Sequence, residues 1–265
     1  MTLQNSPYIG QQKIAVVVDP YSTGCCVAQE IQKRGYLLIA VWTIGFAEEM
    51  KTHVPKSCGR MDYFAEIDEA QTLKQTKARI NEAAQGREIF CCFAGGEAGV
   101  DAADALSEYL GLRTNGTGIA NRRDKYVQQE LIRKVGLRAV RQAGGPIFSD
   151  VEAFLTTEAY PVVLKPTESA GSDGVKLCYT YEEAKQHFEK LMSSQMVNGG
   201  ECPSVLCQEF LQGDEYVVDH VSRDGVHKTV MIWVYDKRKA NGGDFVYFGM
   251  KPVDPTTDKD HVLSK

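Results

Sequence analysis

Several features that would assign a chain to a class at once are absent from this sequence. No run of apolar residues approaches the roughly 18–20 that cross a membrane, and the polar start at residues 1–6 is not that of a signal peptide. Cations are not in excess, since 30 Lys and Arg stand against 35 Asp and Glu and the formal net charge is −5. We therefore expect a cytoplasmic protein that binds neither membranes nor nucleic acid, and any polyanion must meet a local basic cluster.

The sequence also lacks the cysteine spacing of a metal finger or of a disulfide framework. At 265 residues the chain is long enough to bury a core without cross-links. Two cysteine pairs are adjacent in the chain (25–26 and 91–92), and strand neighbours point to opposite faces. Cys202 and Cys207 have no second pair at zinc-binding spacing. We expect all eight cysteines to be small buried apolar residues.

What is present in the first 117 residues is an alternation of strand and helix patterns. Residues 13–19 form a continuous β-branched run, typical of a strand buried on both faces of a parallel sheet. The alternation predicts a doubly wound, Rossmann-like domain over residues 1–117. Its other elements are expected as strands at 37–42, 63–67 and 89–93 and as helices at 25–34, 72–84 and 100–110.

Residues 94–99 (AGGEAG) look at first like a dinucleotide-binding fingerprint. However, they follow the last strand of the unit instead of the first, and their glycine spacing differs from that motif. No acidic residue at a strand end lies about 20 residues further on, as ribose recognition would need. A glycine turn at the sheet edge, within reach of a substrate, fits these residues better, and a nicotinamide-cofactor site is the alternative.

A basic turn follows the turn-rich connector at 112–118, where we place the domain boundary. Arg122, Arg123 and Lys125 open a helix that Gly136 closes. Three cations in the first turn oppose the helix dipole but suit a bound anion. A solvated basic turn is the alternative. The apolar face of this helix is expected to carry Val127, Leu131, Ile132 and Val135.

We expect the site to be built around residues 162–175 (VVLKPTESAGSDGV). Three apolar residues lead into Lys165, Pro166 stops the strand, and a small-residue loop leads to a second strand at 175–179. A lysine in a buried strand is costly unless an anion neutralises it, and exposed N–H groups beside it form an anion cradle. The Walker pattern is excluded, because no Lys-Ser/Thr follows the last glycine. A polyphosphate clamp is one interpretation, and a surface hairpin with a snorkelling lysine is the other.

Beyond this stretch, a strand at 205–211 runs into a glycine turn at 212–215. Such a turn can offer main-chain donors and acceptors to an adenine edge, and Glu215 can accept from sugar hydroxyls. Taken alone, the same residues make a β-turn with an exposed acid. The other elements expected in this half are helices at 148–159 and 181–192 and short strands at 216–221, 228–234 and 244–251, with a turn at 241–243 and a polar tail from 252.

The order of these pieces resembles that of the ATP-grasp ligases. Each motif is weak alone, and it is their joint order over nearly the whole chain that carries the resemblance. The motifs are the helix opening at Lys125, residues 162–166 (VVLKP), 171–175 (GSDGV), 208–211 (QEFL) and 213–216 (GDEY). Three stretches look more narrowly like the L-amino-acid ligases of the bacilysin-synthesis type, namely 123–126 (RDKY), 215–219 (EYVVD) and 222–227 (SRDGVH).

The resemblance implies an ATP-dependent carboxylate–amine ligase that works through an acyl-phosphate and joins amino acids into a dipeptide or amide. It also implies small carboxylate and amine substrates, and Mg²⁺ bridging the ATP phosphates. The implied nucleotide-binding residues are Lys125 and Lys165 at the phosphates, Gln208 at the adenine amino group, Glu209 and Leu211 through their backbones, Glu215 at the ribose, and Ser169, Gly171, Ser172 and Gly174 in the loop over the phosphates.

One part of the family pattern is missing. The family holds Mg²⁺ on a late acidic pair and an asparagine, and nothing at 254–260 resembles that motif. We therefore expect these ligands beyond residue 265 and interpret the chain as a fragment, an incomplete gene model or a degenerate relative. A catalytically incomplete ATP-binding module is the alternative function. For a γ-phosphate contact the sequence does not choose among Lys237, Arg238 and Lys251, and it leaves the oligomeric state open, a homo-oligomer included.

The resemblance also implies a division of the chain. An α/β, Rossmann-like pre-ATP-grasp domain is expected at 1–117, followed by an incomplete α+β ATP-grasp domain. Within the latter, 118–195 would be the N-terminal subdomain with the glycine-rich loop, and 196–265 the truncated start of the C-terminal lobe.

Overall fold

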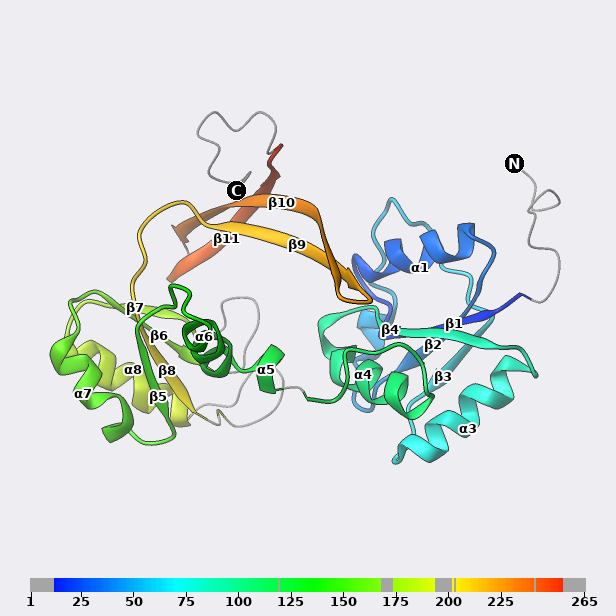
Figure 1. Cartoon of the computed structure of the whole chain (residues 1–265), viewed down its shortest axis with the longest axis horizontal. Coiled ribbons are helices and arrows are strands. Elements are labelled where there is room, and N and C mark those ends of the chain that lie inside the picture. The colour runs from blue at the N-terminus through cyan, green and yellow to red at the C-terminus, as the bar shows by residue number, and fades with distance from the viewer. Residues whose placement is uncertain are drawn as a thin grey trace. The chain divides into compact units, whose positions relative to one another are not determined.

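The computed structural model describes residues 12–118, 120–167, 174–193, 202, 204–240 and 242–254. The chain divides into two compact units, Met1–Ile119 (unit 1) and Ala120–Lys265 (unit 2). Each unit has its own sheet and its own hydrophobic core (Figure 1). Among the helices in the described residues, none is long and apolar enough to cross a membrane.

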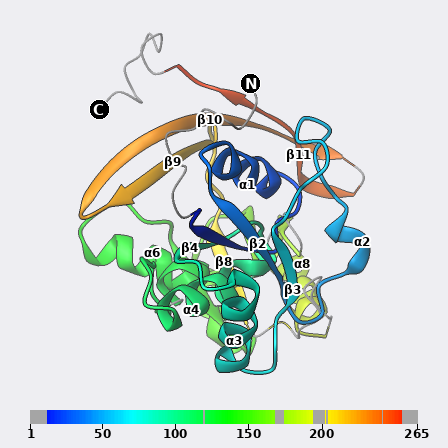
Figure 2. The same ribbon diagram turned by 90° about the vertical axis from the view of Figure 1, so that its right-hand side faces the viewer.

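Unit 1 is built on a parallel four-stranded sheet. Its strands are β1 (Ile14–Val18), β2 (Leu37–Trp42), β3 (Ala65–Asp68) and β4 (Ile89–Ala94); its helices are α1 (Gly24–Lys33), α2 (Glu48–Lys51), α3 (Leu73–Ala84) and α4 (Val100–Tyr109), with the 3-10 turn η2 (Glu97–Gly99) before α4. The strand order is β3-β2-β1-β4. Helix α1 packs on one face of the sheet, and α3 and α4 pack on the other (Figure 2).

This architecture follows from the apolar run at the start of the chain. All five residues of β1 are buried, as expected for a strand flanked by parallel neighbours and covered on both faces. Ile14, Val16 and Val18 point to the core under α3 and α4. Ala15 and Val17 point to the core under α1. The doubly wound domain predicted from the sequence is confirmed, and only the single-turn helix α2 was not among the expected elements.

The cysteines of unit 1 do not all follow the prediction. All eight cysteines of the chain are free thiols. The expectation that all are buried is wrong for Cys26, which is exposed, and Cys91 is only half-buried. The reason is the helical period: α1 buries Cys25 and Ala28 against the sheet, so the intervening Cys26 turns away from it.

Unit 2 contains an antiparallel four-stranded sheet with the order β5-β8-β6-β7. Its strands are β5 (Gln142–Gly145), β6 (Val162–Pro166), β7 (Lys176–Cys178) and β8 (Val205–Glu209), and its helices are α5 (Ala120–Arg123), α6 (Lys125–Lys134), α7 (Ser149–Thr157) and α8 (Tyr181–Ser193). Side chains of α7 and α8, such as Leu155 and Phe188, form the core with Val162 and Leu164 of β6. Strand β5 (QAGG) was not predicted, because it contains no β-branched or aromatic residue.

The basic turn at 122–125 is divided between two helices. Arg122 and Arg123 end α5, and Asp124 separates them from α6. The Asp124 carboxylate caps α6 by accepting from the backbone N–H of Val127 at 2.9 Å. The prediction that three cations share the first turn of one helix is therefore wrong, and only Lys125 lies there. The predicted apolar face of this helix is also not buried, since no residue of α6 is.

A second sheet in unit 2 is made of three long antiparallel strands in the order β11-β10-β9. They are β9 (Tyr216–Arg223), β10 (Val226–Ala240) and β11 (Gly243–Pro252). The prediction of a short strand at 228–234 is wrong, because β10 has 15 residues. Pairing with a neighbour on each side, with bulges at Thr229/Met231 and Asp236/Lys237, carries this strand through polar residues that have no strand pattern of their own.

Candidate functional site

Lys165 lies on β6, inside the four-stranded sheet of unit 2. Val162 and Leu164 of the same strand are fully buried in the core, so strand alternation turns Lys165 to the opposite face. Burial, and after it the charges of Lys125 and Lys237, lower the pKa of Lys165 to about 8, while the charge of Glu215 opposes that shift. Lys165 is thus an ammonium group whose surroundings do not fully compensate its charge.

Lys125 begins α6 and is tied to the chain just beyond β6. Its backbone N–H and its ammonium both donate to the carbonyl oxygen of Thr167, each at 3.4 Å. Thr167 is itself buried, and its hydroxyl lies 2.9 Å from that of Ser204, the residue before β8. The start of α6 is therefore fixed beside the end of β6. This brings Lys125 close enough to Lys165 for its charge to lower the pKa of Lys165.

Lys237 reaches the same place from β10. Its ammonium donates to Oε1 of Glu215 at 2.6 Å and lies over the rings of Tyr235 and Tyr247, 4.8 and 4.5 Å from their centroids. Burial opposes the charge of Lys237, but hydrogen bonds with Glu215 and Tyr247 and the charge of Glu215 together raise its pKa. Lys237 is therefore a firmly protonated partner of Glu215.

These residues form a cluster that we call the lysine cluster: Lys125, Lys165, Lys237 and Glu215. Lys237 pairs with Glu215, and the pKa of Lys165 is lowered first by burial and then by the charges of Lys125 and Lys237, while the charge of Glu215 opposes that shift. Of the three cations that the sequence left open for a γ-phosphate, Lys237 joins the cluster. Arg238 instead pairs with Asp236 at 2.6 Å. Such a group of cations is chemically suited to hold a polyanion.

The glycine-rich loop is anchored at its far end. Gly174 has φ +70°, and a Cβ there would approach Leu191 and Pro166 to about 3 Å, so this position requires glycine. Nε2 of the buried His187 lies 2.8 Å from the Gly174 carbonyl oxygen, and burial lowers the pKa of this histidine. The predicted loop residues Ser169, Gly171 and Ser172 lie outside the described residues.

The end of β8 is held by two separate polar networks. The Gln208 side chain is buried and donates from Nε2 to Oε1 of Gln142 at 2.9 Å. The Glu209 carboxylate is also buried and pairs with Arg138 and Arg141, both at 2.8 Å. Burial opposes the negative charge, but the hydrogen bond from the Arg141 backbone and both guanidinium groups lower the pKa of Glu209. Leu211, two residues beyond the strand, is exposed.

Residues 123–250, which include the whole lysine cluster, match the sequence family described as phosphoribosylglycinamide synthetase, ATP-grasp (A) domain. This match to an ATP-grasp family covers just under half of the chain.

Relatives of this chain include a synthase and amino-acid ligases. It is 29% identical over 238 residues to dapdiamide A synthase of Enterobacter agglomerans, covering 88% of this chain and 54% of that protein. It is 32% identical over 133 residues to alanine–anticapsin ligase of Bacillus subtilis, covering 45% of this chain and 28% of that protein. The crystal structure of an L-amino acid ligase from Bacillus licheniformis shares the fold with a TM-score of 0.65 at 14% identity, covering 90% of this chain and 54% of that chain. This chain thus spans about half the length of these relatives, or less.

Two residues of the candidate site were not singled out from the sequence. Gln142 lies on the unpredicted strand β5, and its register opposite Gln208 is what creates the contact. Lys237 was one of three candidates for a γ-phosphate contact. The feature that could have singled it out is its place two residues after Tyr235 on the same strand and opposite Tyr247 on the next strand. Among the described residues, no three His, Cys, Asp or Glu side chains are placed to hold a metal ion. The tail acids Asp258 and Asp260 lie outside those residues, so the structure assigns no Mg²⁺ ligand.

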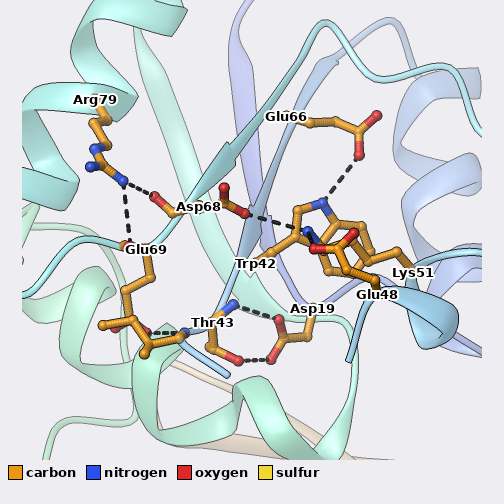
Figure 3. A network of polar contacts seen from close by, with 10 residues as sticks. Asp19, Trp42, Thr43, Glu48, Lys51, Glu66, Asp68, Glu69 and Arg79 are labelled. Atoms are coloured by element: carbon orange, nitrogen blue, oxygen red, sulfur yellow. Dashed lines mark hydrogen bonds and ion pairs between the residues drawn. The ribbon is translucent and has the colours of Figure 1, made fainter. Parts of the chain in front are cut away.

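A second polar cluster lies outside the ATP-grasp domain, at the carboxyl edge of the sheet in unit 1 (Figure 3). The buried Asp19 accepts from the backbone N–H and the hydroxyl of Thr43 at 2.9 and 2.7 Å. Around it, Lys51 donates to Glu48 and Asp68, and the indole of Trp42 donates to Glu66 at 3.1 Å. Burial raises the pKa of Asp19 even though Thr43 stabilises its charge. We call this group the Asp19 cluster.

The glycines at 94–99, at the same edge, are accounted for by close packing. A Cβ on Gly95 would come within 2.6 Å of the Pro20 backbone, and one on Gly24 would overlap the Gly95 carbonyl. A Cβ on Gly96 would overlap the Tyr21 ring. The loop after β4 therefore packs directly on the loop after β1. This packing explains the glycines without a nicotinamide cofactor.

Proposed function

We propose that this chain is the nucleotide-binding part of an ATP-dependent carboxylate–amine ligase that joins amino acids. The observation that carries the proposal is the lysine cluster, in which Lys125 and Lys237, from two other elements, lie near enough to the buried Lys165 to lower its pKa. A triphosphate is the polyanion that an ATP-grasp domain would place there. The names of the relatives, a synthase and an alanine ligase, support the amino-acid substrates.

In this proposal several residues divide the work of holding ATP, and three of them, in the loop, lie outside the described residues. Lys125, Lys165 and Lys237 would neutralise the phosphates, and Ser169, Gly171, Ser172 and Gly174 would form the loop over them. Glu215 accepts Lys237 on Oε1, and Oε2 would accept from a ribose hydroxyl.

The end of β8 would receive the adenine ring. Because Nε2 of Gln208 donates to Gln142, Oε1 of Gln208 is the atom that would accept from the adenine amino group. The backbones of Glu209 and Leu211 would face the ring edge, and the ion pairs of Glu209 would hold that backbone in place.

The reaction we propose has two steps. A carboxylate oxygen attacks the γ-phosphorus of ATP and ADP leaves, which yields an acyl-phosphate. The nitrogen of an amine then attacks the acyl carbon, phosphate leaves, and the nitrogen loses a proton. The lysines lower the barrier by stabilising the charge that develops on the transferred phosphoryl oxygens. Bound Mg²⁺ would neutralise the phosphates further, but no described residue is assigned to it. A cytoplasmic location follows from the proposal, because ATP is supplied there.

Two measurements test the proposal at two levels. Titration calorimetry on the 265-residue chain should show ATP binding that Lys165→Ala weakens. ADP release by the complete protein should depend on Mg²⁺ and rise when amino acids are added. Binding of ATP without any stimulation by amino acids or other small carboxylates would instead support the catalytically incomplete ATP-binding module. Unchanged ATP affinity in Lys165→Ala would overturn both functions.

A further inference from the structure

The segment between α2 and β3, residues 52–64, runs along helix α1 in unit 1 and is attached to it by side chains. The backbone N–H of Ser22, just before α1, donates to the carbonyl oxygen of His53 at 2.7 Å. Further along the helix, the side-chain amides of Gln29 and Gln32 donate to the carbonyl oxygens of Cys58 and Asp62. This segment has no helix or strand, so these contacts and the buried side chain of Cys58 position it.

Within this contact, two thiols meet. The sulfur atoms of Cys26 and Cys58 are 2.9 Å apart, although 32 positions separate the residues in the chain. A disulfide has a sulfur–sulfur distance of about 2.05 Å, so bond formation needs a movement of less than about 1 Å. Cys26 is exposed to solvent, whereas Cys58, a residue of this segment, is buried. The pair therefore combines an accessible sulfur with a protected partner directly behind it.

Other uses of the two thiols fit less well. A metal ion needs further ligands, and no group of three His, Cys, Asp or Glu side chains occurs in the described part of the chain. The neighbouring Cys25 is buried and donates its S–H to the carbonyl oxygen of Pro20 at 3.1 Å, on the sheet side of α1. Redox chemistry between Cys26 and Cys58 is what this geometry allows.

We propose that Cys26 and Cys58 form a reversible dithiol–disulfide site that a peroxide oxidises. The thiolate of Cys26 attacks one oxygen of hydrogen peroxide, and the O–O bond breaks. Cys26 becomes a sulfenic acid, and the departing hydroxide is protonated to give one water. The sulfur of Cys58 then attacks the Cys26 sulfur, the S–O bond breaks, and the Cys58 proton leaves with the oxygen as a second water. Two thiols and one peroxide thus give one disulfide and two waters, and a dithiol reductant reverses the change.

The environment of each sulfur sets the order of these steps. The hydrogen bond with Cys26, and after it burial, raise the pKa of the Cys58 thiol. Cys58 is therefore the weaker initial nucleophile and the better resolving group.

The bond would close a loop that contains α2 and most of α1, and such a cross-link restricts the unfolded chain. We expect the melting temperature of the oxidised chain to rise by about 5 °C or more.

The test uses the reduced 265-residue chain and hydrogen peroxide as the probe. Maleimide labelling of the denatured protein should count eight thiols before oxidation and six after it, since one bond consumes two. Mass spectrometry of a non-reduced tryptic digest should then show the peptide of Cys26 linked to that of Cys58 within one chain. Dithiothreitol should restore all eight thiols and the original melting temperature.

Three variants make the result specific. Cys26→Ser and Cys58→Ser should each abolish the linked peptide, and Cys58→Ser should accumulate a Cys26 sulfenic acid that dimedone traps. Cys58→Ala replaces Cys58→Ser if the latter does not fold. Cys91→Ser, at a half-buried thiol outside the pair, should oxidise like the unmodified chain. A Cys26 bond formed only between two chains, or no linked peptide in the unmodified protein, overturns the proposal.

Discussion

Each unit gathers charged side chains at one end of its sheet, and the two groups differ in how their charges are balanced. In the Asp19 cluster of unit 1, each carboxylate labelled in Figure 3 accepts a hydrogen bond from the protein: Asp19 from Thr43, Glu48 and Asp68 from Lys51, Glu66 from Trp42, and Glu69 from the backbone of Ile44. In the lysine cluster of unit 2, burial and the charges of Lys125 and Lys237 lower the pKa of Lys165, and the charge of Glu215 opposes that shift only in part.

The comparison shows that the balance of charge, and not the number of charged residues, distinguishes a structural network from a binding site. The Asp19 cluster connects β1, β2, β3 and α2, and its polar groups are satisfied within the protein. In the lysine cluster, burial and the charges of two further lysines lower the pKa of Lys165, so its charged form is disfavoured. An added anion would relieve that cost, so ligand binding is expected to stabilise unit 2 and not unit 1.

The largest effect is expected from Lys165→Ala. Loss of a charge-assisted contact removes roughly 1.5–3 kcal/mol, which corresponds to a decrease in ATP affinity of about 10- to 100-fold. The stability of the ligand-free protein should not decrease, because a partly buried charge is removed. Calorimetry with ATP measures the affinity. Lys176→Ala, on the adjacent strand β7, is the matched control and should change the affinity by less than about twofold; an equal loss in both variants would contradict this assignment.

Asp19→Ala should have the opposite effect, a loss of stability without a loss of ATP affinity. The buried donors of Thr43 lose their acceptor, so the free energy of unfolding of unit 1 should fall by about 2 kcal/mol while ATP affinity stays unchanged. Urea unfolding and calorimetry on the same preparation measure the two quantities. Asp19 has φ +50°, which asparagine tolerates, so Asp19→Asn should lose less stability than alanine. A weaker ATP affinity in a fully folded Asp19→Ala protein would show that the two clusters do not have separate roles.

Lys237→Met should weaken ATP binding by about tenfold, less than Lys165→Ala, because Lys237 already has a carboxylate partner. Its neighbour Arg238 provides the control. The Arg238–Asp236 pair is largely solvent-exposed, so Arg238→Met should leave ATP affinity within about twofold. If the two variants behave alike, Lys237 does not belong to the site.

The smallest effect is expected from a change of a single pH unit. The pKa of Lys165 is lowered to about 8 in the folded protein, whereas an unfolded lysine titrates near 10.5. Below pH 8 the lysine is charged in both the folded and the unfolded state, and folding bears the full cost of burying the charge. That cost disappears as the pH rises from 8 to 10.5. The free energy of unfolding of the ligand-free protein should therefore rise over that range. ATP affinity should fall over the same range, by at most about tenfold per pH unit. Calorimetry from pH 7 to 9.5 measures the slope, and Lys165→Met should reduce it.

The fold of unit 1 could be predicted from local pattern alone. The run at 13–19 has one interpretation, a strand buried on both faces, and the glycines and capping residues around it delimit the neighbouring helices. The prediction was less complete where pairing decides the structure. Strand β5 has a sequence of four small or polar residues, and β10 continues through charged residues, because the neighbouring strands satisfy their backbones.

The candidate site was predicted in its parts and not in its assembly. Lys125, Lys165, Gln208 and Glu215 were found because each belongs to a short motif. Lys237 has no motif, and what distinguishes it from Arg238 is its ion pair with Glu215, whose carbonyl oxygen accepts from the Tyr235 N–H of β10. The roles of all of these residues stay predictions until the variants are measured.

The sequence by itself determined the alternation of elements in unit 1, the buried lysine strand and the order of motifs that points to the ATP-grasp domain. The tertiary structure alone decided that Lys237 pairs with Glu215 near Lys165, that Gln142 holds Gln208, and that Cys26 meets Cys58. The physical reason is the range of the interactions. Periodicity and capping act over a few neighbouring residues, whereas charge balance and sulfur–sulfur contact depend on atoms that only folding brings within a few ångströms of each other.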